Sequence, residues 1–85
     1  MARRFGRHAE YDAEADAIYV YLSDSRVART KILDDSRNID VSEDGAVVGI
    51  EFLGVSGGAG LSDVPHKSTV EKLIGELGLG IKIFA

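Results

Sequence analysis

The sequence predicts an α+β fold: an antiparallel β-meander of four to five strands, packed on one face by a single C-terminal amphipathic helix. Short segments of alternating apolar and polar residues recur up to residue 54, with polar turn residues between them. A glycine-rich stretch then interrupts the alternation. After it, apolar residues follow helical spacing along one stripe.

The 85 residues predict a single domain, because two cores of half this size would each be unstable. The expected parts are a basic N-terminal arm at 1–8, the β-meander at 9–54, a Gly-rich linker at 55–62, the helix at 63–78, and a C-terminal tail or edge strand at 79–85. The chain has no cysteine, which excludes disulfides and thiolate zinc sites. Self-association is therefore the expected source of extra stability.

Five segments are expected as strands: 5–11, 16–24, 27–33, 38–42 and 46–53. In the third of these, Arg29 and Lys31 are expected on the side that faces solvent. The pair Asp44-Gly45 favours a tight hairpin turn between the last two segments, because both residues tolerate a positive φ. These turns at short intervals are what predicts a meander.

The helix is predicted from a stripe at i, i+3, i+4 and i+7, formed by Val70, Leu73, Ile74 and Leu77. Ser68 and Glu71 have the spacing of a capping box, and Gly78 is placed for the left-handed residue that ends a helix. Two points stay open on the residues alone. The helix begins either near Ser68 or already at 63–65, and residues 81–84 are either tail or edge strand.

A second face of the expected sheet has nothing left in the chain to cover it. Four candidate interface residues fall on this face: Tyr19, Tyr21, Val47 and Leu53. An apolar sheet face of this kind either tolerates water or meets a partner. We expect a homodimer packed through it.

Two blocks of the sequence resemble a known bacterial family, the domain of unknown function 2283. Its members typically show Tyr-Asp-x-x-x-Asp-Ala-hydrophobic-Tyr-hydrophobic-x-Leu, and residues 11–23, YDAEADAIYVYLS, resemble that segment. Residues 39–53, IDVSEDGAVVGIEFL, are similar to the second block of the family. The resemblance covers roughly residues 9–54 and implies a small protein with no established activity and no catalytic residue. It adds antitoxin-like pairing with a small protein partner as an expected kind of function.

Residues 54–58 have the Gly-x-Ser-x-Gly form of a nucleophile elbow. That motif requires a strand-to-helix turn in a parallel α/β sheet, with an acid and a histidine far downstream, so Ser56 is interpreted as a linker serine. Gly57 and Gly58 are candidate ligand residues, because backbone amides ahead of a helix are able to hold an anion.

Three acids, Asp12, Glu14 and Asp16, have the spacing of the first ligands of a calcium loop. The glycine and the glutamate that complete such a loop are missing, so the acids are interpreted as turn-forming charge. They remain candidate ligand residues for a weak divalent-cation site, if the fold brings them to Asp34 or Asp35.

No cofactor and no metal site is expected. His8 and His66 are the only imidazoles, and they are interpreted as surface residues. A cytoplasmic location is expected, because the N-terminus lacks a signal-peptide pattern and no apolar run approaches the ~20 residues of a membrane span. The net charge of −4 disfavours nucleic-acid binding, although residues 1–8 are basic.

The sequence therefore favours a non-enzymatic module that forms a homodimer or binds a protein partner. One alternative is a small-ligand or metal-dependent enzyme with its site at the acidic turns and the Gly-rich linker. A second alternative is nucleic-acid binding through Arg3, Arg4 and Arg7.

Overall fold

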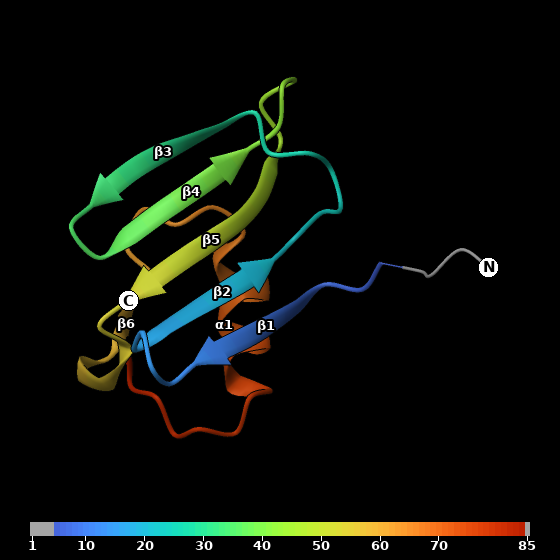
Figure 1. Cartoon of the computed structure of the whole chain (residues 1–85). Coiled ribbons are helices and arrows are strands. Elements are labelled where there is room, and N and C mark those ends of the chain that lie inside the picture. Colours follow the sequence, from blue (N-terminus) through green and yellow to red (C-terminus); the bar gives the residue numbers. More distant parts are fainter. Residues whose placement is uncertain (1–4, 85) are drawn as a thin grey trace.

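A five-stranded antiparallel sheet forms the frame of the computed structural model, which describes residues 5–84 (Figure 1). Its strands are β1 (His8–Asp12), β2 (Ala17–Tyr21), β3 (Arg29–Asp34), β4 (Arg37–Val41) and β5 (Val47–Leu53). The other elements are the 3-10 helix η1 (Val55–Gly57), β6 (Ala59–Gly60), the helix α1 (Lys67–Gly75) and β7 (Ile83–Phe84). The expected α+β class is confirmed.

The strand order differs from the predicted meander. The strands lie side by side in the order β1-β2-β5-β4-β3, so β5 is inserted between β2 and β4 (Figure 1). Strands β2 to β5 thus have the order of a Greek key, and β3 becomes an edge strand. Alternation in a sequence specifies which face a residue occupies but not which strand lies beside it, and for this reason the pairing was missed.

One face of the sheet is packed against the rest of the chain. Strand and helix residues form a single buried cluster, which includes Ile18, Val20, Ile50, Phe52, Val70, Leu73 and Ile74. In Figure 1 the helix lies behind β1 and β2, so it covers only that part of the face. The chain between β5 and α1 adds further members to the cluster: Val55, Ala59, Leu61 and Val64.

Residues 55–62, expected as a linker, are ordered structure. They hold η1 and β6, and β6 pairs in parallel with β7 to make a second, two-stranded sheet. Residues 81–84 therefore include a strand, but it is not an edge of the main sheet. Gly58 has a φ of 110° and lies against the ring of Phe84, where a Cβ would overlap that ring.

The helix is shorter than the predicted 63–78. It begins at Lys67, after a left-handed His66 that makes no side-chain cap. Ser68 is already inside the first turn, so the predicted capping box does not form. Gly78 is left-handed, as predicted, and its amide donates to the Gly75 carbonyl at 3.1 Å. Among residues 5–84, no helix is long and apolar enough to cross a membrane.

The edge strand β3 is exposed except at Leu33, which packs partly against the buried cluster. Arg29 and Lys31 are exposed as expected, but their partners across the sheet, Val41 and Ile39, belong to the buried cluster, so they lie on the helix side. Ile32 follows Lys31 in the strand and lies on the opposite face. Its side chain is 78% exposed.

Candidate functional site

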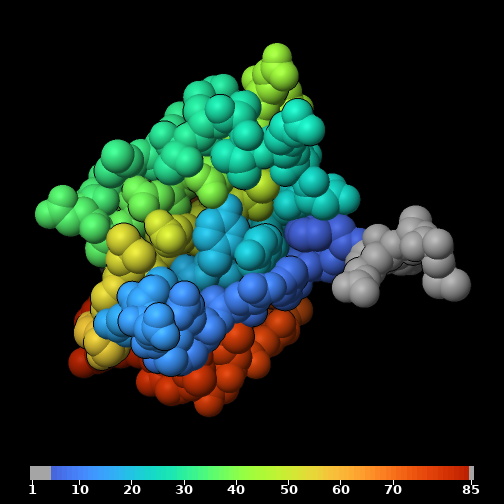
Figure 2. Space-filling model, in the orientation of Figure 1, coloured from blue at the N-terminus to red at the C-terminus, as the bar shows by residue number. Residues whose placement is uncertain are grey.

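The outer face, by which we mean the face of the main sheet opposite α1, carries three of the predicted interface residues. Tyr19 and Tyr21 come from β2 and Leu53 from β5, and all three side chains are partly exposed. Figure 2 shows this face toward the viewer, with the helix behind it. Within residues 5–84, no helix or strand lies over it (Figure 1).

Val47, the fourth predicted interface residue, lies elsewhere. The pairing of β4 with β5 shifts register between Asp40 and Val41, and Val47 comes to lie opposite Val41. It packs partly against the buried cluster. A bulge adds one residue to a strand and changes the face that the following residues occupy, and simple alternation does not reveal where it occurs.

A hollow of about 260 Å³ lies on the outer face over β1, β2 and β5. Its lining combines apolar, aromatic and acidic residues from the three strands and the β1–β2 turn: Glu10, Tyr11, Asp12, Ala15, Ala17, Ile18, Tyr19, Tyr21, Glu51 and Leu53. A concave surface with aromatic walls and a few polar groups is typical of a binding site.

Three rings are in contact on the outer face, one from β1 and two from β2. His8 stacks on Tyr21, with ring centroids 4.7 Å apart and an angle of 13° between the planes. Tyr21 in turn contacts Tyr19, whose centroid is 4.6 Å away and whose plane is tilted by 55°. Rings in such contact hold each other in place, so the three rings form a preorganised surface.

Tyr19 reaches across β5 to β4. Its hydroxyl donates to Asp40 Oδ2 at 2.5 Å, and Thr30 Oγ1 of β3 donates to Asp40 Oδ1 at the same distance. Gly49 of β5 lies under the ring, and a Cβ at this position would overlap the ring. A glycine in a strand often marks such a close approach. The contacts fix the Tyr19 ring in one position on the outer face.

The Tyr19 hydroxyl of the outer face stays protonated. Burial raises the pKa of the Tyr19 hydroxyl above its usual value, and the hydrogen bond to Asp40 raises this pKa further. Beside it, Asn38 Nδ2 donates to Glu51 Oε1 at 3.0 Å. The tyrosine is therefore a neutral donor at ordinary pH, with no sign of activation as a nucleophile or a base.

The acids of the β1–β2 turn shape the backbone. Asp12 Oδ1 accepts from the amide of Ala15, three residues later, at 3.1 Å, and this contact closes the turn. Asp16 is left-handed, with a φ of 53°, and its carboxylate binds Ser56 twice: Oδ1 accepts from the amide at 2.9 Å and Oδ2 from the hydroxyl at 2.7 Å. These contacts fasten η1 to the β1–β2 turn.

The fold does not group these acids with Asp34 or Asp35 as metal ligands. In the described part of the chain, no three His, Cys, Asp or Glu residues are grouped to hold a metal ion. Asp34 is bound to Arg37 instead, with Oδ2 2.7 Å from Nη2. The hydrogen bonds from Arg37 and from the Ser36 amide lower the pKa of Asp34 to about 2.

A comparison with protein-family models matches residues 8–56 to the family described as Protein of unknown function (DUF2283). The match covers more than half of the 85 residues. The chain belongs to this family. No curated protein and no solved structure matches it.

The boundaries of the DUF2283 match have a structural meaning in this member. The match begins at the first residue of β1 and ends at Ser56, so it contains the whole five-stranded sheet and the Asp16–Ser56 contact between the β1–β2 turn and η1. The helix lies outside the match. Asp12 and Asp16 of the family segment thus have a role in the fold that needs no catalysis.

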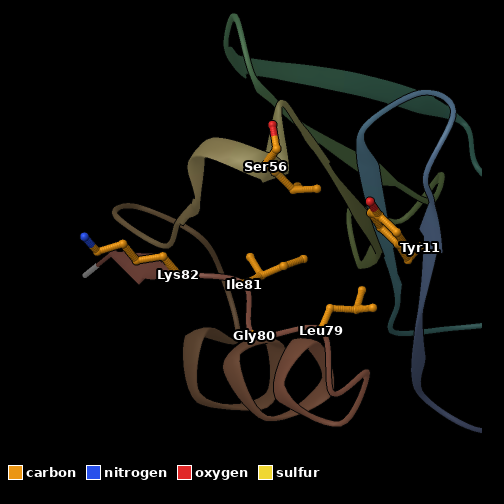
Figure 3. A pocket seen from close by; sticks show the side chains of 7 residues that line it. Tyr11, Ser56, Leu79, Gly80, Ile81 and Lys82 are labelled. Atoms are coloured by element: carbon orange, nitrogen blue, oxygen red, sulfur yellow. The ribbon is translucent and has the colours of Figure 1, made fainter.

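A second hollow, of about 300 Å³, lies beside Ser56 and shares Tyr11 with the first (Figure 3). Tyr11 and Ser56 face Leu79 and Ile81 across it, and the amine of Lys82 points away. Ser56 donates its hydroxyl to Asp16 rather than to a histidine, and the main sheet is antiparallel. The geometry of a nucleophile elbow is therefore absent from residues 54–58.

The remaining predicted residues are distributed over the surface. Gly57 is open, whereas Gly58 is covered by Phe84. His66 is exposed next to the helix, far in sequence from the His8 stack. Arg3 and Arg4 lie outside the described residues, and Arg7 Nε donates to the Leu22 carbonyl at 3.2 Å.

Three residues of the outer face were missed from the sequence: Ile32, Asp40 and Gly49. The glycine within a strand was the one available sign, since it indicates a close approach. Asp40 and Ile32 had none, because their neighbours on the face are set by the strand order.

Proposed function

We propose that the protein is a non-enzymatic module that works by association through its outer face, and that the partner is a second copy of the chain. The observation that supports this is the aromatic hollow on an uncovered side of the sheet, lined by Tyr19, Tyr21 and Leu53. Tyrosine side chains are enriched at the centres of protein interfaces, where burial contributes most to affinity.

The size of the chain supports the same proposal. A domain of 85 residues has a thin margin of stability, and association adds buried apolar area that a small core lacks. The residues first considered for chemistry serve the fold, because Asp16 holds Ser56 and Asp12 holds the turn. This leaves the outer face as the surface whose composition the fold alone does not explain.

Sedimentation equilibrium tests the proposal. We expect a mass that rises with concentration towards twice the 9.1 kDa of the chain. Leu53→Glu places a charge in the hollow and should raise the dissociation constant at least about tenfold. Leu79→Glu is the matched control: Leu79 is 45% exposed, lines the other hollow, and should leave association unchanged. A purely monomeric protein, or an equal effect of both changes, would refute the proposal.

A second candidate function is small-ligand binding in the hollow beside Ser56. Its support is the cavity of about 300 Å³ between Tyr11 and Ile81. A thermal-shift panel of divalent cations and common nucleotides tests it, since any ligand that binds only the native state raises the melting temperature. A panel without a shift argues against this candidate and leaves the outer-face proposal untouched.

A further inference from the structure

Ile32 is an apolar side chain that the fold leaves in solvent. It is 78% exposed, which is the largest value among the exposed large hydrophobic residues of the described chain. It lies on the outer face, because its partner Asn38 pairs with Glu51, which pairs with Tyr19. Ile32 thus projects from one edge of the same face that carries the hollow near the other edge.

Ile32, called the knob below, and the hollow of the outer face lie in one row across the sheet. Cross-strand pairing links five residues in a line: Ile32, Asn38, Glu51, Tyr19 and Glu10. Tyr19 and Glu10 line the hollow. Strands β3 and β2 are three spacings apart, so the knob is about 14 Å from the hollow. One chain cannot close this distance, because both positions are fixed by the sheet.

Resting on the proposed function, we propose that two copies pack outer face to outer face with Ile32 of each copy seated in the hollow of the other. A two-fold axis that runs along the strands reverses the order across the sheet but preserves the position along each strand. The row from Ile32 to Glu10 in one copy therefore lies over the same row of the other copy, in the reverse order. With the axis between β5 and β4, β3 of one copy lies over β2 of the other, next to its β1.

The middle of the row is complementary in the same arrangement. Asn38 of one copy faces Glu51 of the other, and these are the side chains that already pair within the chain at 3.0 Å. An amide donor thus meets a carboxylate acceptor at the two-fold axis. Two sheets stacked in this way form an aligned sandwich, with the strands of both sheets in nearly the same direction.

Pairing of two β3 edges is the competing way to cover Ile32 with a second copy. That edge carries Lys31, and its register is interrupted by a bulge between Ile32 and Asp34. Charged residues and bulges are the features that keep edge strands from pairing. Pairing of two β3 edges would also leave the hollow open, whereas face-to-face packing covers both the knob and the hollow.

Cysteine cross-linking tests the arrangement, because the natural chain contains no cysteine. Two single variants, Ile32→Cys and Glu10→Cys, both change exposed residues. After the two chains are mixed and exchanged, a short bifunctional maleimide should join them into a mixed dimer. Neither variant should cross-link to itself, since the two copies of each residue lie at opposite edges of the interface. A mixture of Ile32→Cys with Lys72→Cys on the helix is the control that should not cross-link.

Each result decides the matter. Cross-linking of Ile32→Cys to itself would show edge pairing and overturn this arrangement. A dimer by mass without mixed cross-links would overturn it and leave the proposed function standing, whereas a monomer by mass would overturn both. As a second measurement, Ile32→Ser should raise the dissociation constant at least about tenfold, because two buried side chains are lost per dimer. Leu79→Ser should not change it, and an equal effect would also overturn the proposal.

Discussion

Gly49 and Tyr19 give the sharpest test of how the outer face is built. In Gly49→Ala the new Cβ overlaps the Tyr19 ring, so the ring must move and its hydroxyl must leave Asp40. Overpacking costs about 1–3 kcal/mol, and a hydrogen bond to a charged group contributes about 1.5–3 kcal/mol. The site is partly exposed, which reduces both values, and alanine is favoured over glycine in a strand by about 0.5–1 kcal/mol. We expect a net loss of about 2 kcal/mol in the free energy of unfolding.

Urea unfolding followed by circular dichroism measures this loss, at protein concentrations low enough to keep the chain monomeric. Gly75→Ala is the matched control. No atom lies within 4 Å of a Cβ at this helical position, so the change should stabilise the protein by about 0.5–1 kcal/mol. In a Tyr19→Ala background the ring is gone, and Gly49→Ala should cost almost nothing. An equal cost of Gly49→Ala in both backgrounds would refute the reasoning.

Three further predictions concern single side chains. Arg37→Met should lower the free energy of unfolding by about 1–3 kcal/mol, because Arg37 Nη1 donates to two backbone carbonyls of the connection to the helix; equal urea midpoints would contradict this. Asp34 has a pKa lowered to about 2 by Arg37, so its contribution is present above the unfolded-state pKa and is lost as pH falls towards 2; Arg37→Met should flatten this acid limb of a stability–pH curve. Asp16→Ala should cost about 2–3 kcal/mol and Asp16→Asn less, because the amide keeps an acceptor for Ser56 and tolerates the left-handed backbone; thermal unfolding ranks them, and a reversed order would refute the role of Asp16.

The pH dependence at the alkaline end follows from Tyr19. Its pKa is raised in the folded state, so the neutral hydroxyl is the form that stabilises the fold. This contribution is fully present below the unfolded-state pKa and is lost as pH rises above about 10. Ultraviolet titration of the three tyrosines should show a late ionisation step, and Tyr19→Phe should remove this step. If all three titrate together, the contact with Asp40 does not persist in solution.

The strands were predictable because each has an alternating pattern with turn residues at its ends. The hairpin at Asp44-Gly45 is an example, although only Gly45 of this pair has a positive φ, of 88°. The helix stripe at Val70, Leu73 and Ile74 is buried as predicted. Local steric and hydrogen-bonding rules decide such features within a few residues, so they are present in the sequence.

The bounds of the helix were less predictable. A capping box at Ser68 was possible on spacing alone, but the left-handed His66 precedes the helix, which therefore begins two residues earlier than that box allows. Val64 is buried in the core cluster, and its amide donates to the Leu61 carbonyl in a separate turn. Burial of the Val64 side chain thus keeps residues 61–64 in a separate turn ahead of the helix. Helix propensity depends on local sequence and does not include such a tertiary contact.

The candidate site divides in the same way. Tyr19, Tyr21 and Leu53 were assigned to one face correctly, because residues two apart in a strand share a face. Val47 was assigned to that face wrongly, because the bulge near Val41 is created by the pairing of two strands rather than by either strand alone.

The sequence by itself determined the class of fold, the strands and the half-apolar second face of the sheet, over which no helix or strand of residues 5–84 lies. Only the tertiary structure decided that β5 lies between β2 and β4, which places Ile32 and Tyr19 in one row and Gly49 under a ring. The physical reason is the range of the interactions. Alternation and turn chemistry act between near neighbours, whereas strand order follows from the burial of the whole core, to which every strand contributes at once.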